Sequence, residues 1–250
     1  MAVKVKNTKS DPPRPCTIIL YGRHKVGKTR FVGTMPKPVF IVPRQETGTM
    51  SLNAIVEVVD GFDYIEAGTI QEYLDACLFV KDNADKRGWR TCAVDPLTSF
   101  GRLFQLEIEQ KYPNRKDNFS IWGEVMQTVL NGWKILQGVV HLVWVCHTDE
   151  GKSGDFVLEE KPALVGKSIE ILEANADIVL FMTARVIEHH DAEGKVTASK
   201  KVRQVWVRCP PTVNPPFRVG GRYEEAFGET NSFLPDWSIF ANRLKGYIRT

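Results

Sequence analysis

Short apolar runs alternate with segments of mixed polarity along the chain. The apolar runs have the length and composition of buried strands. They lie at residues 16–22, 37–43, 54–60, 90–95 and 139–146. Two later runs, at 176–188 and 203–209, surround a polar turn and predict a pair of antiparallel strands.

The segments between these runs carry helical spacing. Thr69 to Glu72 forms a capping-box pattern that opens a helix, and residues 97–111 also look helical. Residues 120–137 form an amphipathic helix, whose tryptophans fit a core face better than a ligand-stacking one. A last helix is predicted over 237–248, and residues 148–168 are expected to be a long polar loop.

This alternation of strands and helices predicts the α/β class. We expect a mostly parallel central sheet flanked by helices, with an antiparallel hairpin near the C-terminus. Residues 1–14 form a basic, proline-bearing segment that we expect to be a mobile tail. No repeat or long linker divides the remainder, so residues 15–250 are predicted to be one domain.

The amino-acid composition excludes only a few classes of protein. The chain has 250 residues, of which 43% are hydrophobic and 25% charged, and its net charge of +3 neither requires nor excludes a nucleic-acid partner. The five cysteines include no CxxC pair, which argues against a zinc or redox motif. With no apolar run long enough for a signal peptide or a membrane span, we expect a cytoplasmic protein without a membrane partner.

One motif carries specific chemistry. Residues 22–29, GRHKVGKT, fit the phosphate-binding pattern G-x-x-x-x-G-K-[ST] between a predicted strand and a predicted helix. Glycines let backbone N–H groups approach phosphates, the lysine reaches the β- and γ-phosphates, and the threonine hydroxyl faces Mg²⁺. The sequence therefore predicts ATP and Mg²⁺ as cofactors. The residues expected to bind the nucleotide are Gly22, Arg23, His24, Lys25, Val26, Gly27, Lys28, Thr29 and Arg30.

Three further polar residues complete the predicted site. Asp95 ends a buried strand and is the expected metal-side carboxylate together with Thr29, although Asp-Pro can also begin a helix. Pro96 follows it, so a catalytic carboxylate must come from elsewhere, and Glu46 is the candidate; a solvated loop glutamate is the alternative. His147 ends another strand and is either a γ-phosphate sensor or an ordinary strand-end histidine.

The order of these features resembles that of RecA-type ATPases, and more narrowly the phage-encoded RecA- and RadB-like proteins of single-strand annealing and recombination. The resemblance covers roughly residues 16–210, including FIVPRQETG, AVDPLTSF, the Trp122-Gly123 pair, KPALVGK and ADIVLF. It implies a RecA-like P-loop NTPase core, and a bacterial host cytoplasm if the protein is phage-encoded. It also implies catalytic roles for Lys28, Glu46 and His147.

The resemblance further implies a homo-oligomer, ring or filament, in which a neighbour's basic side chain reaches the nucleotide. The candidates for this trans-acting finger are Arg203, Arg218 and Arg222. It implies DNA contact by two loops, with solvated loops as the alternative. The candidate DNA-binding residues are Lys111, Arg115, Lys116, Lys152, Lys161 and Lys167.

The leading hypothesis is an ATP-hydrolysing recombination or annealing protein that acts on single-stranded DNA, with a single-strand-binding protein as a further candidate partner. A nucleotide-dependent motor or helicase accessory is a second hypothesis. A nucleotide-gated DNA-binding module with weak hydrolysis is a third, and a small-molecule kinase is a fourth, for which no lid or acceptor pocket can be located in the sequence.

Overall fold

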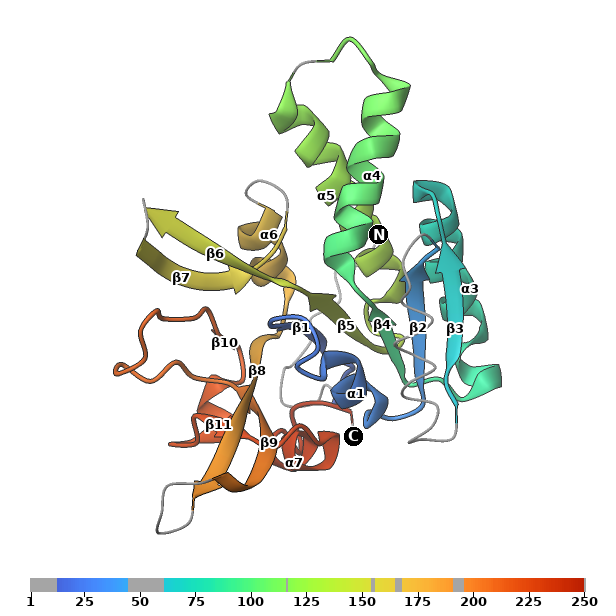
Figure 1. The fold of residues 1–250 in the computed structure, drawn as a ribbon. Coiled ribbons are helices and arrows are strands. Elements are labelled where there is room, and N and C mark those ends of the chain that lie inside the picture. The colour runs from blue at the N-terminus through green and yellow to red at the C-terminus, as the bar shows by residue number, and fades with distance from the viewer. Residues whose placement is uncertain are drawn as a thin grey trace.

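The computed structural model describes residues 13–44, 61–115, 117–153, 156–164, 168–190 and 196–249 (Figure 1). The strands are β1 Thr17–Tyr21, β2 Pro38–Pro43, β3 Asp63–Ala67, β4 Thr91–Val94, β5 His141–Cys146, β6 Thr148–Ser153, β7 Phe156–Pro162, β8 Ile178–His190, β9 Val196–Trp206, β10 Gly220–Gly221 and β11 Ser232–Phe233. The helices are α1 Lys28–Gly33, α3 Ile70–Arg87, α4 Leu97–Lys111, α5 Asn118–Leu136, α6 Ser168–Asn175, the 3-10 turn η2 Glu224–Phe227 and α7 Trp237–Arg243.

One sheet organises the chain, with the strand order β11-β9-β8-β1-β5-β4-β2-β3 and β10 beside β8. All neighbours from β8 to β3 are parallel, whereas β9, β10 and β11 add antiparallel strands at the C-terminal side. Parallel neighbours need crossover connections, and these place helices on the sheet faces. The predicted α/β class, with a mostly parallel central sheet flanked by helices and a C-terminal antiparallel hairpin, is confirmed.

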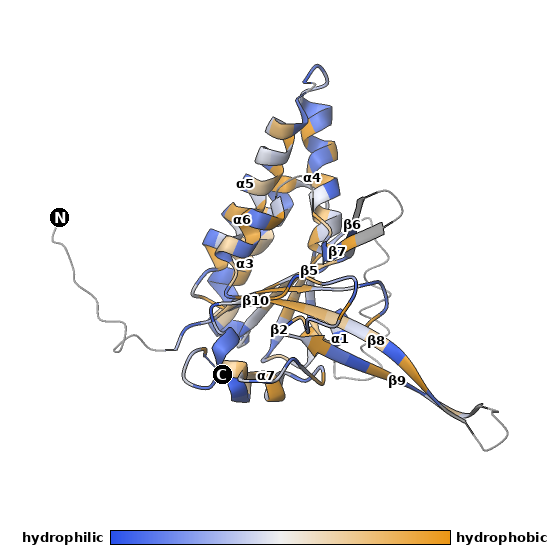
Figure 2. Cartoon of the chain, turned by 90° about the vertical axis from the view of Figure 1, so that its left-hand side faces the viewer, coloured by the Kyte–Doolittle hydropathy of each residue, from blue (hydrophilic) through white to orange (hydrophobic). Residues whose placement is uncertain are grey.

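The two faces of the sheet carry separate hydrophobic clusters, because side chains alternate along each strand. Ile19 and Tyr21 of β1 join the cluster covered by α3, α4, α5 and α6. Ile18 and Leu20 join the opposite cluster, which α1 and α7 cover. In Figure 2 the first group of helices lies on one side of the sheet and α7 on the other. The core is thus two apolar layers around a central sheet.

Two helices extend well beyond this core. α4 and α5 form an antiparallel pair that projects away from the sheet, with their connecting turn at its far end (Figure 1). We call this pair and its turn the α4–α5 arm. Within the described residues, no helix has both the length and the apolar content to cross a membrane.

The predicted helix starts are confirmed to within two residues. Thr69 caps α3 by accepting a hydrogen bond from the Glu72 amide at 3.2 Å, and the Glu72 carboxylate accepts one from the Gly68 amide at 2.6 Å. The capping box therefore reaches one residue further upstream than the ideal pattern. The amphipathic helix begins at Asn118 and buries Val125 and Val129 as predicted.

Two predictions about secondary structure were wrong, and one strand was not predicted. The expected loop over 148–168 contains the β6–β7 hairpin. The sequence of β6 has no alternation of apolar residues from which a strand could be predicted. The last helix ends at Arg243, shortly before Gly246, whose φ of 91° is left-handed and incompatible with helix. Strand β3 was not predicted, because Tyr64 and its neighbours are largely exposed on this sheet edge.

Some predictions lie outside the described residues. These are the strand at 54–60, most of the tail at 1–14, and the residues Glu46, Lys116 and Lys167. Arg14, at the end of the predicted tail, is described and contacts the domain, since its Nη2 lies 3.4 Å from Oδ1 of Asp177.

A buried histidine ties the chain ends to the sheet. His141 is 2% exposed, its Nδ1 accepts the Cys16 backbone N–H at 3.0 Å, and its Nε2 lies 2.6 Å from the Arg249 carbonyl oxygen. This pair of contacts suits the neutral ring protonated at Nε2. Burial lowers the pKa of His141 from 6.5 to about 4.

We expect the free energy of unfolding to fall as the pH drops from 6.5 toward 4. In this window the unfolded chain protonates His141 and the folded chain does not, which costs up to about 1.4 kcal/mol per pH unit. Urea unfolding of the His141→Gln variant should show a decline roughly 1.5 kcal/mol smaller between pH 6.5 and 5. Parallel pH profiles for variant and native protein would contradict this.

Candidate active site

The candidate site lies at one edge of the parallel sheet. β1, β4 and β5 are neighbours in the order β1-β5-β4, so their carboxyl ends meet at the same edge. The phosphate-loop motif follows β1, Asp95 follows β4 and His147 follows β5. The carboxyl edge of an open parallel sheet is the usual place for ligand binding in α/β folds.

The loop conformation requires both motif glycines. A Cβ at Gly22 would lie 2.3 Å from the carbonyl oxygen of Met182, so no larger residue fits there. Gly27 has a left-handed φ of 105° and occupies the N-cap of α1 without a side-chain cap. Within the described residues, the first-turn amides of α1 therefore donate no hydrogen bond to a capping side chain.

Lys28 places its charge inside the loop. Its side chain is buried, and Nζ donates hydrogen bonds to the carbonyl oxygens of Gly22 at 2.7 Å and Arg23 at 2.9 Å. Burial lowers the pKa of Lys28 to about 8, and the nearby Asp95 opposes that shift. The ammonium group thus remains largely protonated at neutral pH and can attract an anion.

Thr29 and Asp95 come together although they lie far apart in the chain. Thr29 Oγ1 donates a hydrogen bond of 2.6 Å to Asp95 Oδ2. A hydroxyl and a carboxylate are the hard oxygen donors that Mg²⁺ takes in phosphate sites, where substrate phosphates and water complete its shell. These two side chains therefore fit the predicted metal. The N-cap position of α4 is held by Pro96.

His147 packs beside the loop. Its ring stacks on His24 with 3.8 Å between ring centroids, and its backbone N–H donates to Thr98 Oγ1 at 3.0 Å. Burial, together with the charges of Lys28, His24 and Arg102, lowers the pKa of His147 to about 4. The ring is neutral at physiological pH. Its role as a γ-phosphate sensor stays a prediction.

The β6–β7 hairpin contacts the phosphate loop on one side through ion pairs. Arg23 Nη2 lies 2.8 Å from Oε1 of Glu160 and 3.4 Å from Oε1 of Glu150. Glu160 is 8% exposed, so this ion pair is partly shielded from water. Sequence reasoning missed both acidic partners because the hairpin had been predicted as a loop. Beside these ion pairs is a cavity of about 730 Å³, lined by Arg23, His24, Thr148, Asp149 and Glu150.

The three predicted finger arginines occupy different environments. Arg218 is held by two carboxylates, with Nη2 2.9 Å from Glu159 and Nη1 3.3 Å from Glu173. Arg222 pairs at 3.6 Å with Asp177, which precedes β8 at the edge opposite the phosphate loop. Arg203 lies next to Gly27 of its own chain. The action of these arginines on a neighbouring subunit stays a prediction.

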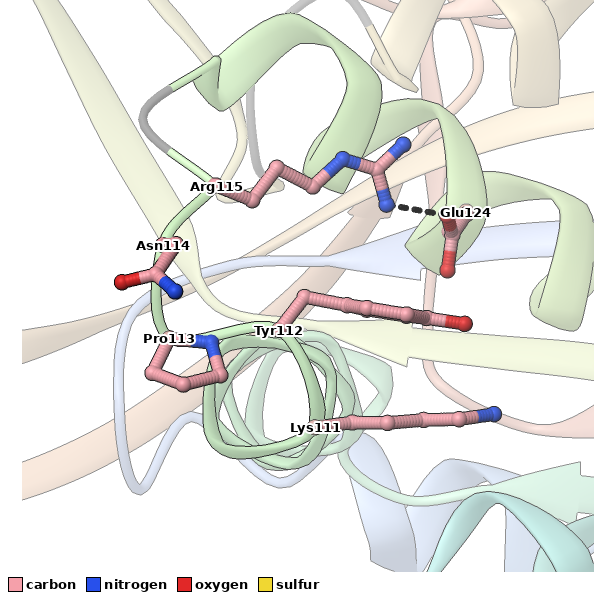
Figure 3. A pocket seen from close by; sticks show the side chains of 6 residues that line it. All are labelled: Lys111, Tyr112, Pro113, Asn114, Arg115 and Glu124. Atoms are coloured by element: carbon pink, nitrogen blue, oxygen red, sulfur yellow. Dashed lines mark hydrogen bonds and ion pairs between the residues drawn. The ribbon is translucent and has the colours of Figure 1, made fainter.

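The predicted DNA-binding residues lie on two separate elements. Lys111 and Arg115 are at the end of the α4–α5 arm, where they flank the ring of Tyr112 at 5.4 and 5.5 Å (Figure 3). Arg115 also forms an ion pair with Glu124. Lys152 lies on β6, and Lys161 lies on β7 opposite Asp149. The two groups belong to the two chain segments that the sequence predicted for DNA contact, one after the Asp95 strand and one after the His147 strand.

The family described as AAA domain matches residues 14–213. The chain belongs to this family. The match covers the phosphate loop, Thr29, Asp95 and His147, and it makes the chain an AAA-type P-loop ATPase domain. A search of the curated proteins found no match.

Two solved structures are similar to this AAA domain in fold. A prototypical ATPase from the type III secretion system of pathogenic bacteria is 9% identical, with a TM-score of 0.49, and the alignment covers 68% of this chain and 51% of that chain. This chain therefore spans about half the length of the secretion ATPase. A KaiC-like protein from the hyperthermophilic archaeon Pyrococcus horikoshii is 11% identical, with a TM-score of 0.44, and the alignment covers 84% and 87% of the two chains.

We expect Lys28→Ala to weaken ATP binding by at least about 100-fold, because it removes the one buried ammonium group inside the loop. Equilibrium binding of a fluorescent ATP analogue measures this. Thr29→Val keeps the side-chain shape. It should leave the ATP affinity measured without metal unchanged and should reduce the gain in ATP affinity on adding Mg²⁺ by about tenfold or more.

The matched control is Lys81→Ala, which removes an exposed lysine of α3 and should change neither quantity. Unchanged ATP affinity in Lys28→Ala would refute the phosphate-loop assignment. Unchanged Mg²⁺ dependence in Thr29→Val would remove Thr29 from the metal site.

Proposed function

We propose that this AAA domain hydrolyses ATP with Mg²⁺ and couples the nucleotide to binding of single-stranded DNA in recombination or annealing. The observation that carries the nucleotide part is the convergence of Lys28, Thr29 and Asp95 at the carboxyl edge of the sheet. These side chains supply one positive charge and hard oxygen donors for a metal from two segments, the start of α1 and the end of β4.

The residues divide the chemical work. Lys28 would neutralise charge on the β- and γ-phosphates, Thr29 and Asp95 would hold Mg²⁺, and the bound ion would supply further positive charge to the phosphates. Catalysis of phosphoryl transfer depends mainly on such positioning and electrostatics. Because Pro96 stands directly after Asp95, we assign the water-activating carboxylate to Glu46.

The DNA part of the proposal is supported by the end of the α4–α5 arm. Phe119 is 74% exposed there and meets the ring of Trp122 edge-on at 5.6 Å between centroids. Lys111 and Arg115, which contact Tyr112 at the same end of the arm, provide positive charge. Exposed aromatic rings next to basic side chains suit single strands, since bases stack while phosphates pair with the cations.

The side chains at the end of the arm also indicate which aromatic ring is available for stacking with a base. Lys111 and Arg115 lie on opposite sides of the Tyr112 ring (Figure 3), so a base can stack on Tyr112 only by displacing one of them. Phe119 carries no such cover from these two residues. We therefore assign base stacking to Phe119, and phosphate contact to Lys111 and Arg115 together with Lys116. Lys152, Lys161 and Lys167 remain candidates for a second strand contact.

A homo-oligomer, ring or filament, and a single-strand-binding protein are the proposed partners. A nucleotide-dependent motor or helicase accessory uses the same core, and a gated module with weak hydrolysis uses the same loop. These alternatives differ from the leading proposal in turnover and in strand separation rather than in the site itself.

We expect the combined change of Lys111, Arg115 and Lys116 to alanine to weaken binding of a fluorescent oligonucleotide and to reduce its salt dependence. Each lost phosphate contact on a single strand lowers the slope of log affinity against log salt by about 0.7, so the total change should approach 2. Titrations at several salt concentrations measure the slope.

The matched control replaces Lys81, Lys86 and Lys134, which are exposed and lie away from the end of the arm, with the same loss of charge. An equal slope in the arm variant and the native protein would place the DNA elsewhere. A separate Phe119→Ala change should reduce affinity without changing the slope.

We expect ATP turnover that rises with single-stranded DNA and disappears in Glu46→Gln while ATP binding persists. The amide cannot accept a proton from water, but it keeps the side-chain shape. A coupled phosphate-release assay with and without DNA tests both. Turnover without DNA stimulation, or undiminished turnover in Glu46→Gln, would overturn the respective assignment, and DNA-strand separation would favour the motor.

A further inference from the structure

Two basic side chains of β9 reach the phosphate loop of their own chain. A Cβ built at Gly27 would lie 2.9 Å from Nε and 3.0 Å from Cδ of Arg203. Lys201 Nζ lies 3.4 Å from the carbonyl oxygen of Lys25. Residues two apart in a strand point to the same side, so one face of β9 presents both cations to the loop.

The sheet holds this arrangement within a single chain. β8 runs parallel to β1 with Phe181 beside Tyr21, the residue that leads into the phosphate loop. β9 pairs antiparallel with β8, and Arg203 lies opposite Ala184. The backbone ladder from β1 through β8 to β9 therefore fixes Arg203 next to the loop without a contribution from another subunit.

Within the described part of the chain, Arg203 is the finger candidate whose charge meets no carboxylate. Its Nε is buried without a hydrogen-bond partner, and no ion pair to Arg203 occurs among the described residues. Arg218 and Arg222, by contrast, are bound to carboxylates of their own chain. A buried polar atom without a partner is costly, and an anion placed beside it relieves that cost.

We infer that Arg203 contacts the triphosphate bound by its own chain, with Lys201 beside it, and so acts in cis instead of on a neighbouring subunit. The inference rests on the proposed function, because it takes ATP as the ligand of the loop. It removes Arg203 from the candidates for a trans-acting finger and leaves Arg218 and Arg222 as candidates for that role. Positive charge at this position stabilises charge that develops on the transferred phosphoryl group.

The first test measures ATP turnover of Arg203→Ala and Arg203→Gln over a wide range of protein concentrations. We expect a loss of about 100-fold in turnover, and the ratio of native to variant activity should be the same at every concentration. The matched control is Arg185→Ala on the neighbouring strand. Arg185 pairs with Val202, so it lies on the opposite face of the hairpin and its removal should leave turnover unchanged.

The second test mixes two inactive variants, Lys28→Ala and Arg203→Ala, in varied proportions. If Arg203 acts within its own chain, every site in the mixture lacks either the lysine or the arginine, and turnover does not recover. If it acts between subunits, a site with an intact loop can receive Arg203 from a Lys28→Ala neighbour, and turnover recovers.

The outcomes separate this inference from the proposed function. Recovery in the mixture, a ratio that changes with protein concentration, or full turnover in both Arg203 variants would overturn action in cis while leaving the ATPase intact. Absence of ATP binding and turnover in the native protein would overturn the proposed function itself. Unchanged thermal melting of Arg203→Gln distinguishes a lost contact from a lost fold.

Discussion

The hydrogen bond between Thr29 and Asp95 is the interaction on which the site depends. It joins the start of α1 to the end of β4, and it can form only because β1 and β4 are parallel and end at the same edge of the sheet. The neighbouring strand β5 brings His147 to that edge as well. A shift in strand order would separate the metal-side carboxylate from the phosphate loop.

The phosphate loop is supported from two sides by elements with different electrostatic roles. On one side, Arg23 is paired with Glu160 and Glu150 of the β6–β7 hairpin, and its charge is largely compensated. On the other side, Lys201 and Arg203 of β9 approach the loop without a carboxylate among the described residues. The first side is suited to hold the loop in shape, and the second is suited to meet an anion.

The α4–α5 arm is connected directly to the same edge. α4 begins immediately after Asp95 and Pro96, and Thr98 in its first turn accepts the His147 amide hydrogen and donates to the carbonyl oxygen of Ala163 at 2.9 Å. The proposed metal-side residue and the proposed DNA contact are thus the two ends of one segment. This continuity gives the AAA domain a short covalent route between nucleotide and arm.

The sequence by itself determined the local features, because they depend on neighbouring residues. The phosphate-loop motif, the strand predicted at 16–22 and the capping box at Thr69 are set by glycine freedom, apolar runs and side-chain capping, all visible within a few positions. The α/β class followed from their alternation. The β6–β7 hairpin stayed hidden because β6 is polar throughout, so its pairing leaves no periodic signal.

Only the tertiary structure decided which of the candidate arginines meet a carboxylate within the described segments. The three arginines predicted as finger candidates look alike in the sequence, yet Arg218 meets two carboxylates, Arg222 meets one, and Arg203 lies against Gly27. Likewise, the fold brings Thr29 to Asp95 and His24 to His147. Such pairings join residues far apart in the chain, and strand order and register place them, which no local pattern encodes.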